Sequence, residues 1–133
     1  MRGLDQQILA RLRENARESN LSMASELSVS EGTIRKHIAD LKASGTIQRF
    51  TVDVKRDAAA IVELKTTPNI DTTIIAKNIK ALGVRQVVEV AGSYDIICFI
   101  EAESLAMMNE MIEQIRGIEG VKETQTMPVL KNI

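Results

Sequence analysis

The chain has 133 residues, of which 44% are apolar and 26% charged, so it can form one ordinary domain or two small ones with packed cores. Aromatic residues make up only 2%, which argues against binding of single-stranded nucleic acid by base stacking. The lone cysteine, Cys98, excludes an intramolecular disulfide, and with the single histidine it excludes a thiolate or imidazole metal cluster. No apolar run has the length of a membrane span, and no signal peptide is visible. The sequence therefore predicts a cytoplasmic protein without a membrane partner or a cofactor.

The charges are divided unevenly along the chain. Residues 1–56 hold ten Lys/Arg against seven Asp/Glu, whereas residues 57–133 hold seven against eleven. A basic half joined to an acidic half indicates that only the first half meets a polyanion.

Three short helices are predicted before residue 45. The first covers residues 4–15, and the second runs roughly from its expected N-cap, Ser22, to Leu27. After a tight turn at residues 28–30, Ser30 is expected to cap a third helix from Glu31 to about Ser44, which Gly45 ends. The third helix has an apolar stripe that is expected to be buried: Ile34, Ile38 and Leu41.

The pattern changes to period two after the third helix. Residues 46–54 alternate between apolar and polar and are rich in β-branched residues, so they predict a strand or wing. A charged break at residues 55–57 is the expected domain boundary. The first domain is therefore expected at residues 1–54 and the second at residues 58–133.

The second half is predicted to have the order β-α-β-β-α-β of a ferredoxin-like domain. Strands are expected at residues 58–66, 84–91, 96–101 and 121–130, and helices between Asp71 and Gly83 and between Ser104 and Gly117. The strand at 96–101 is almost wholly apolar and is expected to be central, while Pro128 places the end of the last strand at a sheet edge or bulge. The fold class is therefore α+β, a winged helix-turn-helix followed by a ferredoxin-like domain.

Three helices with a tight turn before the third are typical of a helix-turn-helix that binds double-stranded DNA. If the apolar stripe of the third helix is buried, Gly32 and Lys36 lie on the opposite face, with Thr33 and Arg35 on its flanks. Gly32 lowers helix stability and so suggests a close approach to another molecule. The candidates for base contacts are Thr33, Arg35 and Lys36, and those for phosphate contacts are Lys42, Arg49 and the amides around Ser22 and Ser30.

Five segments, in order, resemble motifs of the Lrp/AsnC (feast/famine) family of transcription regulators. Residues 4–9 resemble the opening "LDxxDxxIL", residues 28–38 the recognition segment "GLSxxTVxxRIxxL", and residues 44–50 the wing entry "xGVIxGY". Residues 92–95 resemble the "GxYD" turn and residues 120–126 the final "GVxxTxT" strand. The resemblance also adds His37 to the DNA-binding candidates, at a position where the family often has arginine.

The resemblance implies a homodimer, a higher even oligomer such as a tetramer or octamer, and a small amino-acid-like effector bound between dimers. Carried over by position, the effector site consists of Gly92, Ser93, Tyr94, Asp95, Thr124 and Thr126. A tight turn can offer backbone amides to a carboxylate, Asp95 can bind an ammonium, and the threonine hydroxyls can bond either group. The two threonines are two residues apart, hence on one face of the strand, and we expect the core not to need that face.

Two alternatives stay open, one for the role of the turn and one for the class of the whole protein. Residues 92–95 also form a good turn between antiparallel strands, in which Asp95 only binds backbone amides. The chain could instead be a metabolite-binding regulatory or assembly subunit whose helix-turn-helix contacts a protein. An enzyme is not expected, because His37 has no paired nucleophile and there is neither a glycine-rich phosphate loop nor a pair of carboxylates in a predicted cleft.

Overall fold

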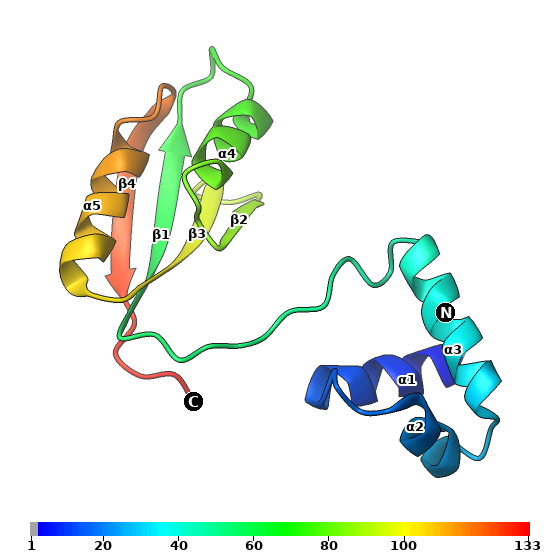
Figure 1. The fold of residues 1–133 in the computed structure, drawn as a ribbon. Coiled ribbons are helices and arrows are strands. Elements are labelled where there is room, and N and C mark those ends of the chain that lie inside the picture. The colour runs from blue at the N-terminus through cyan, green and yellow to red at the C-terminus, as the bar shows by residue number, and fades with distance from the viewer. Residues whose placement is uncertain (1–2) are drawn as a thin grey trace. The chain divides into compact units, whose positions relative to one another are not determined.

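The computed structural model describes residues 3–133, and their contacts divide the chain into two units (Figure 1). The first unit ends at Asp53, and the second runs from Val54 to Ile133. None of the helices among these residues is long and apolar enough to cross a membrane.

The first unit is a trio of helices: α1 (Gly3–Glu14), α2 (Asn20–Leu27) and α3 (Glu31–Ala43). Their apolar faces meet in one core of buried residues, Ile8, Met23, Ala24, Ile34 and Leu41. Ser30 caps α3 as predicted, because its hydroxyl oxygen accepts a hydrogen bond from the amide of Thr33 at 3.1 Å.

Helix α2 begins earlier than predicted. Its N-cap is Ser19, whose hydroxyl oxygen accepts from the amide of Ser22 at 3.0 Å, so Ser22 lies inside the first turn. Either serine suits an N-cap chemically, and the observed helix places Met23 and Ala24 in the core. The turn that follows α2 contains Ser28 in the left-handed conformation, with φ 57° and ψ 43°.

The predicted strand at residues 46–54 does not form in the described chain. Within this segment the amide of Ile47 donates to the carbonyl of Leu41 in α3 at 3.0 Å, which is not a strand pairing. A strand needs a neighbour for its backbone hydrogen bonds, and neither unit provides one for this segment. Its apolar side chains consequently remain exposed: Phe50, Val52 and Val54.

The second unit is a four-stranded antiparallel sheet in the order β2-β3-β1-β4. Its elements are β1 (Ala58–Thr66), α4 (Thr72–Lys80), β2 (Gln86–Glu89), β3 (Ile96–Ala102), α5 (Leu105–Arg116) and β4 (Val121–Pro128). The predicted ferredoxin-like layout is confirmed, with β3 in the interior of the sheet and Pro128 on the edge strand β4. Strand β2 is shorter than predicted at both ends, and the carbonyls of Val84 and Arg85, just before its first residue, accept hydrogen bonds from the amine of Lys80.

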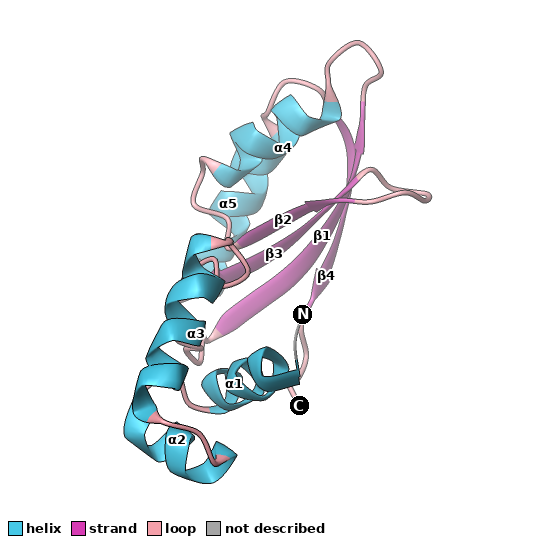
Figure 2. Cartoon of the chain, turned by 90° about the vertical axis from the view of Figure 1, so that its right-hand side faces the viewer, coloured by secondary structure: helices cyan, strands magenta, loops and turns pink. Residues whose placement is uncertain are grey.

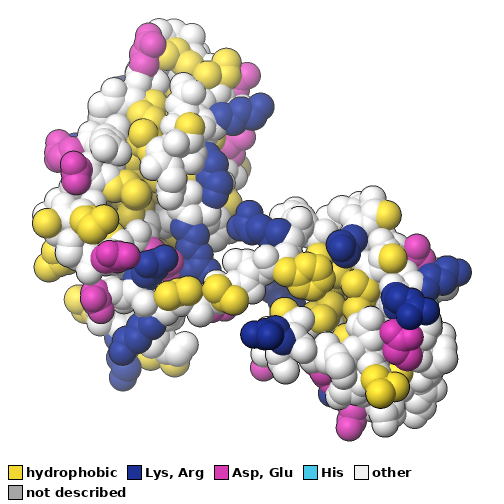
Figure 3. Space-filling model, in the orientation of Figure 1, with side chains coloured by type: hydrophobic (Ala, Val, Ile, Leu, Met, Phe, Trp, Pro, Cys, Tyr) yellow, Lys and Arg dark blue, Asp and Glu magenta, His cyan; other side chains and the backbone are white. Residues whose placement is uncertain are grey.

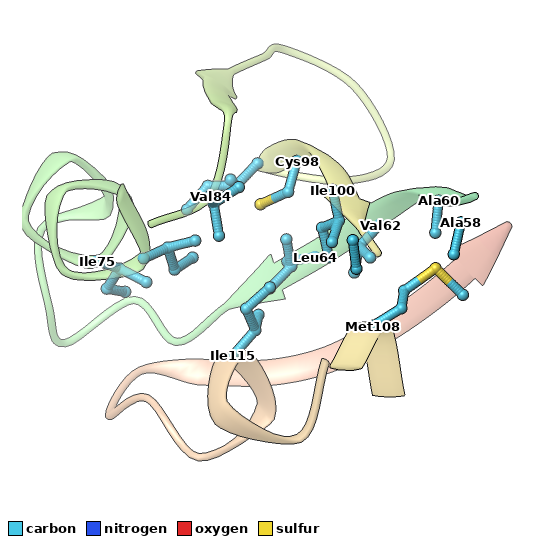
Figure 4. Packing of buried hydrophobic residues seen from close by; sticks show 13 residues of the cluster. Ala58, Ala60, Val62, Leu64, Ile75, Val84, Cys98, Ile100, Met108 and Ile115 are labelled. Atoms are coloured by element: carbon cyan, nitrogen blue, oxygen red, sulfur yellow. The ribbon is translucent and has the colours of Figure 1, made fainter. Parts of the chain in front are cut away.

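Both helices of the second unit lie on the same face of the sheet (Figure 2). Figure 4 shows side chains from β1, β3, α4 and α5 pointing toward one another between the layers. Alternate residues of β1 and β3 supply most of this core, including Val62, Leu64, Cys98 and Ile100, all at most 1% exposed. The opposite face of the sheet carries no helix within this unit, as Figure 2 shows.

Candidate DNA-binding and effector-binding sites

The faces of α3 are arranged as the sequence predicts. Ile34 and Leu41 are buried against the other two helices, while Arg35, Lys36 and Lys42 are exposed. Gly32 and Thr33 are half-buried in the first turn of the helix. The side of α3 away from the core is therefore basic and carries small residues near its N-terminus, which suits entry into a major groove.

Two of the predicted base-contacting side chains already have partners within α3. The guanidinium Nη1 of Arg35 binds the two carboxylate oxygens of Glu31 at 3.0 and 3.3 Å. The hydroxyl of Thr33 shares a hydrogen bond of 2.7 Å with that of Ser30. Both contacts are exposed, so they contribute little to the stability of the fold.

His37 is placed differently from the other candidates. Its Nδ1 lies 2.7 Å from Oδ1 of Asp5, and each side chain is only 16% exposed. The imidazole thus joins α3 to α1. The residues are 32 positions apart, so no sequence spacing could indicate the contact.

The start of α2 is joined to α1 by an ion pair. Arg11 Nη2 lies 2.5 Å from Glu18 Oε1, and Ser22 donates its hydroxyl to the same oxygen at 3.1 Å. The hydrogen bond from Arg11 lowers the pKa of Glu18 below its ordinary value. The backbone amide of Ser22 is also bonded, to its N-cap, so the amides predicted to meet a phosphate here include one that is already satisfied.

Arg49 borders a groove of about 540 Å³ in the first unit. Figure 3 shows hydrophobic atoms gathered on the visible face of this unit, with Lys and Arg side chains around them. The groove lies between the second half of α1 and residues 46–53, and none of the predicted effector residues lines it.

In the second unit, Asp95 is tied to the end of β1. Its Oδ2 accepts hydrogen bonds from the amide of Thr66 at 2.9 Å and from the hydroxyl of Thr66 at 3.2 Å. Its own amide donates to the carbonyl of Leu64 at 2.8 Å. Of the two roles considered for Asp95, these contacts show the structural one, in which it fastens the Gly92–Asp95 turn to the sheet.

Tyr94 points to the helix-free face of the sheet. Its hydroxyl donates to Oε1 of Gln125 at 2.5 Å, and Lys65 Nζ lies 5.6 Å from the centre of its ring. Lys65 also lies 3.7 Å from Glu123. The turn therefore lies beside polar and charged side chains of β1 and β4, namely Lys65, Glu123 and Gln125.

The two threonines of β4 lie on the other face. Thr124 pairs with Leu64 and Thr126 with Val62, and side chains of paired residues share a face. Since Leu64 and Val62 are fully buried beneath the helices, the expectation that the core does not need this face was wrong. Within one subunit Thr124 and Thr126 therefore lie on the opposite face from Tyr94.

Cys98 lies in the core of the second unit and is fully buried. Burial raises the pKa of its thiol to about 12, so the reactive thiolate is almost absent near neutral pH. The thiol therefore acts as a small apolar side chain.

Comparison with known proteins relates both units to one family. Residues 1–48 match the winged helix-turn-helix DNA-binding family model, and residues 59–133 match the Lrp/AsnC ligand binding domain. The chain belongs to the Lrp/AsnC family. It is a DNA-binding transcription regulator with a ligand-binding domain, and the family predicted from its motifs is confirmed.

Several other proteins are similar to this Lrp/AsnC chain. The HTH-type transcriptional regulator LysM of Sulfurisphaera tokodaii is 41% identical over 130 residues, which cover 96% of this chain and 93% of the relative. The homocitrate synthase of Sulfolobus acidocaldarius is 39% identical over 75 residues, covering 56% of this chain but 16% of the enzyme. A solved complex of a Neisseria meningitidis transcriptional regulator with L-Met has the same fold, with a TM-score of 0.85 at 17% identity over 100% of this chain and 92% of that one.

Proposed function

We propose that this Lrp/AsnC protein is not an enzyme and that it binds double-stranded DNA as a homodimer, or a tetramer or octamer of such dimers, under the control of a free amino acid. Residues 1–54 form the DNA-binding domain and residues 58–133 the sensing domain. The DNA contacts are made by Ser22, Ser30, Gly32, Thr33, Arg35, Lys36, Lys42 and Arg49, with His37 positioning α3. The effector contacts are made by Gly92, Ser93 and Tyr94 of one subunit, in the turn that Asp95 fastens to the sheet, and by Thr124 and Thr126 of another.

The exposed face of α3 is the observation that carries the DNA-binding proposal. Burial of Ile34 and Leu41 leaves Arg35, Lys36 and Lys42 outward on the helix that follows the turn. A helix used to bind a partner protein would expose large apolar side chains instead. Between the basic side chains, α3 exposes only small apolar residues, Ala39 and Ala43, which favours DNA over a protein partner.

The homocitrate synthase relative supports a sensing role rather than an enzymatic one. The similar segment is 16% of that enzyme, whereas the regulator relative is matched over 93% of its length. A segment that occurs in both a regulator and an enzyme is best understood as a ligand-binding module joined to different functional domains. We therefore assign this module the binding of a metabolite rather than the catalysis of a reaction.

An amino acid fits the polar groups at the end of the sheet. The Gly92–Asp95 turn is held rigidly by the contacts of Asp95 with Thr66 and Leu64, so its backbone groups are pre-organised for a ligand. The fold neighbour in complex with L-Met supports an amino acid as the ligand class. Because Thr124 and Thr126 lie on the other face of their own sheet, their part in the site requires a neighbouring subunit.

The helix-free face of the sheet is the proposed dimer interface. Met127, Ile61 and Phe99 lie side by side across β4, β1 and β3 on this face, since Val62 and Cys98 point to the core. Phe99 is 38% and Met127 37% exposed, so a row of apolar side chains meets solvent in the single chain. A sheet of this kind needs a second layer, and a second copy provides one.

Calorimetric titration of the intact protein with the twenty amino acids and with homocitrate tests the effector assignment. We expect one amino acid to bind, and Ser93→Ala and Thr126→Val to weaken its binding at least several-fold. Footprinting then tests the DNA assignment, for which a pseudo-palindromic site with half-sites separated by about 10 base pairs or a multiple is expected. Binding of homocitrate alone would overturn the ligand class, and a footprint without two-fold symmetry would overturn the dimeric mode of binding.

A further inference from the structure

The first turn of α3 contains an arrangement that the predicted contacts do not explain. Glu31 binds Nη1 of Arg35 through both carboxylate oxygens, at 3.0 and 3.3 Å. Gly32 lies between them in the sequence, and a Cβ built on Gly32 would be 3.7 Å from the other terminal nitrogen of Arg35, Nη2. The guanidinium therefore folds back beside Gly32, toward the N-terminal end of the helix.

The fold gains little from the ion pair between Glu31 and Arg35, and it does not need a glycine at position 32. The side chains of Arg35 and Glu31 are 69% and 36% exposed, and an exposed ion pair adds little to stability. A Cβ at Gly32 would meet nothing closer than 3.7 Å in the described chain, which is ordinary contact, and glycine is a poor helix former. An alanine would thus fit the free protein, so the reason for glycine lies outside the chain.

The pair is better suited to a base edge than to a phosphate. Glu31 neutralises much of the charge of Arg35 and would itself repel a phosphate. A base edge requires donors in a fixed direction, and a carboxylate on the previous turn holds the guanidinium in one direction. The N-terminal part of a recognition helix is also the part that contacts bases in the major groove.

We propose that Arg35 reads a guanine in each half-site, that Glu31 is the positioning residue for it, and that Gly32 gives the clearance for close approach. Arg35 donates through its outward N–H groups to O6 and N7 of the guanine, the acceptors that arginine fits in bidentate fashion. The inference rests on the DNA-binding function and adds the base that is read and the residue that orients its reader.

The experiment starts by selecting binding sequences from random duplex DNA with the full-length wild-type protein. Affinities for the selected duplex and for a scrambled one are then measured for wild type, Arg35→Lys, Glu31→Gln and Gly32→Ala. Asp40→Asn is the matched control, because it also removes one exposed negative charge from α3. The quantity compared is the ratio of selected to scrambled affinity.

We expect Glu31→Gln to keep or raise affinity for scrambled DNA but to lower the ratio about 5- to 150-fold, the range for a lost bidentate contact. Asp40→Asn should raise both affinities and leave the ratio unchanged. Arg35→Lys keeps the charge but not the planar guanidinium, so it should also lower the ratio of selected to scrambled affinity. Gly32→Ala should raise the thermal unfolding temperature of the protein while weakening binding to the selected duplex.

Replacing the read guanine by 7-deazaguanine, which lacks N7, identifies the base. The wild type should lose affinity on this duplex, and Arg35→Lys should lose much less. The inference is overturned if Glu31→Gln and Asp40→Asn leave the same ratio, or if removing N7 from every selected guanine has no effect. If the wild type selects no sequence at all, the proposed sequence-specific DNA binding fails, which is a different outcome from an unchanged ratio in the variants.

Discussion

The imidazole of His37 on α3 is hydrogen-bonded to the carboxylate of Asp5 on α1, with 2.7 Å between Nδ1 and Oδ1. The contact fixes the recognition helix to the first helix of the unit, and both side chains are largely shielded from solvent. We therefore expect His37 to act on DNA binding through the position of α3, and its neighbour Lys36, on the exposed face, to be the side chain that reaches DNA.

Replacement of His37 by alanine tests this division of roles between His37 and Lys36. We expect His37→Ala to lower the free energy of unfolding of the first unit by about 1–3 kcal/mol, because Asp5 loses a partly buried partner. Lys36→Ala should leave stability within about 0.5 kcal/mol and lower DNA affinity. Urea unfolding and DNA titration of both variants check this. Unchanged stability with lost DNA affinity in His37→Ala would show that the histidine contacts DNA directly.

The left-handed residue in the turn before α3 predicts a stabilising substitution. Ser28 has φ 57°, a conformation that costs an L-residue about 1–2 kcal/mol and glycine almost nothing. Ser28→Gly should therefore raise the free energy of unfolding by up to about 1 kcal/mol, after the entropy of the more flexible unfolded chain is subtracted. Ser25→Gly, at an exposed helical position of α2, is the control and should lower it by a similar amount. Equal effects at both positions would contradict the argument.

Asp95 and Ser93 are expected to separate stability from effector binding. Asp95→Ala leaves the amide of Thr66 without its acceptor and should cost about 1–3 kcal/mol of stability in the second unit. Ser93 is exposed, so Ser93→Ala should not change stability but should weaken amino-acid binding. Thermal unfolding with and without the amino acid measures both effects. If Ser93→Ala binds the ligand as the wild type does, Ser93 is not part of the site.

A charge on the helix-free face of the sheet should disrupt assembly. Phe99→Glu places a carboxylate at one end of the apolar row, on the interior strand β3, where a dimer interface would leave it without water or a partner. We expect a monomer by sedimentation velocity, with an unchanged circular dichroism spectrum. Ile74→Glu, at a 53% exposed position of α4, should keep the dimer. A dimeric Phe99→Glu protein would place the interface elsewhere.

Cys98 should not react with thiol reagents while the second unit is folded. Its pKa of about 12, against an ordinary value of 9.0, reduces the thiolate population near neutral pH about a thousandfold, and burial blocks access as well. Labelling with an aromatic disulfide reagent in increasing urea should therefore follow the unfolding of this unit. Fast labelling in the absence of denaturant would contradict a buried thiol.

Local chemistry and periodicity determined most of the secondary structure. Strand β1 was predicted at its observed bounds, after the charged break that precedes it in the sequence, and Ser30 was identified as the cap of α3 by its side chain. The exposed face of α3 also followed from periodicity alone, since burial of Ile34 and Leu41 fixes where Lys36 points.

The tertiary structure decided the features that depend on a partner distant in the sequence. Residues 46–54 have the pattern of a strand, but a strand exists only where a neighbour supplies hydrogen bonds. The face on which Thr124 and Thr126 lie was set by the register of β4 against β1, which period two cannot give. The pairing of His37 with Asp5 and of Asp95 with Thr66 arose in the same way, because folding alone brings these polar groups together across 32 and 29 positions.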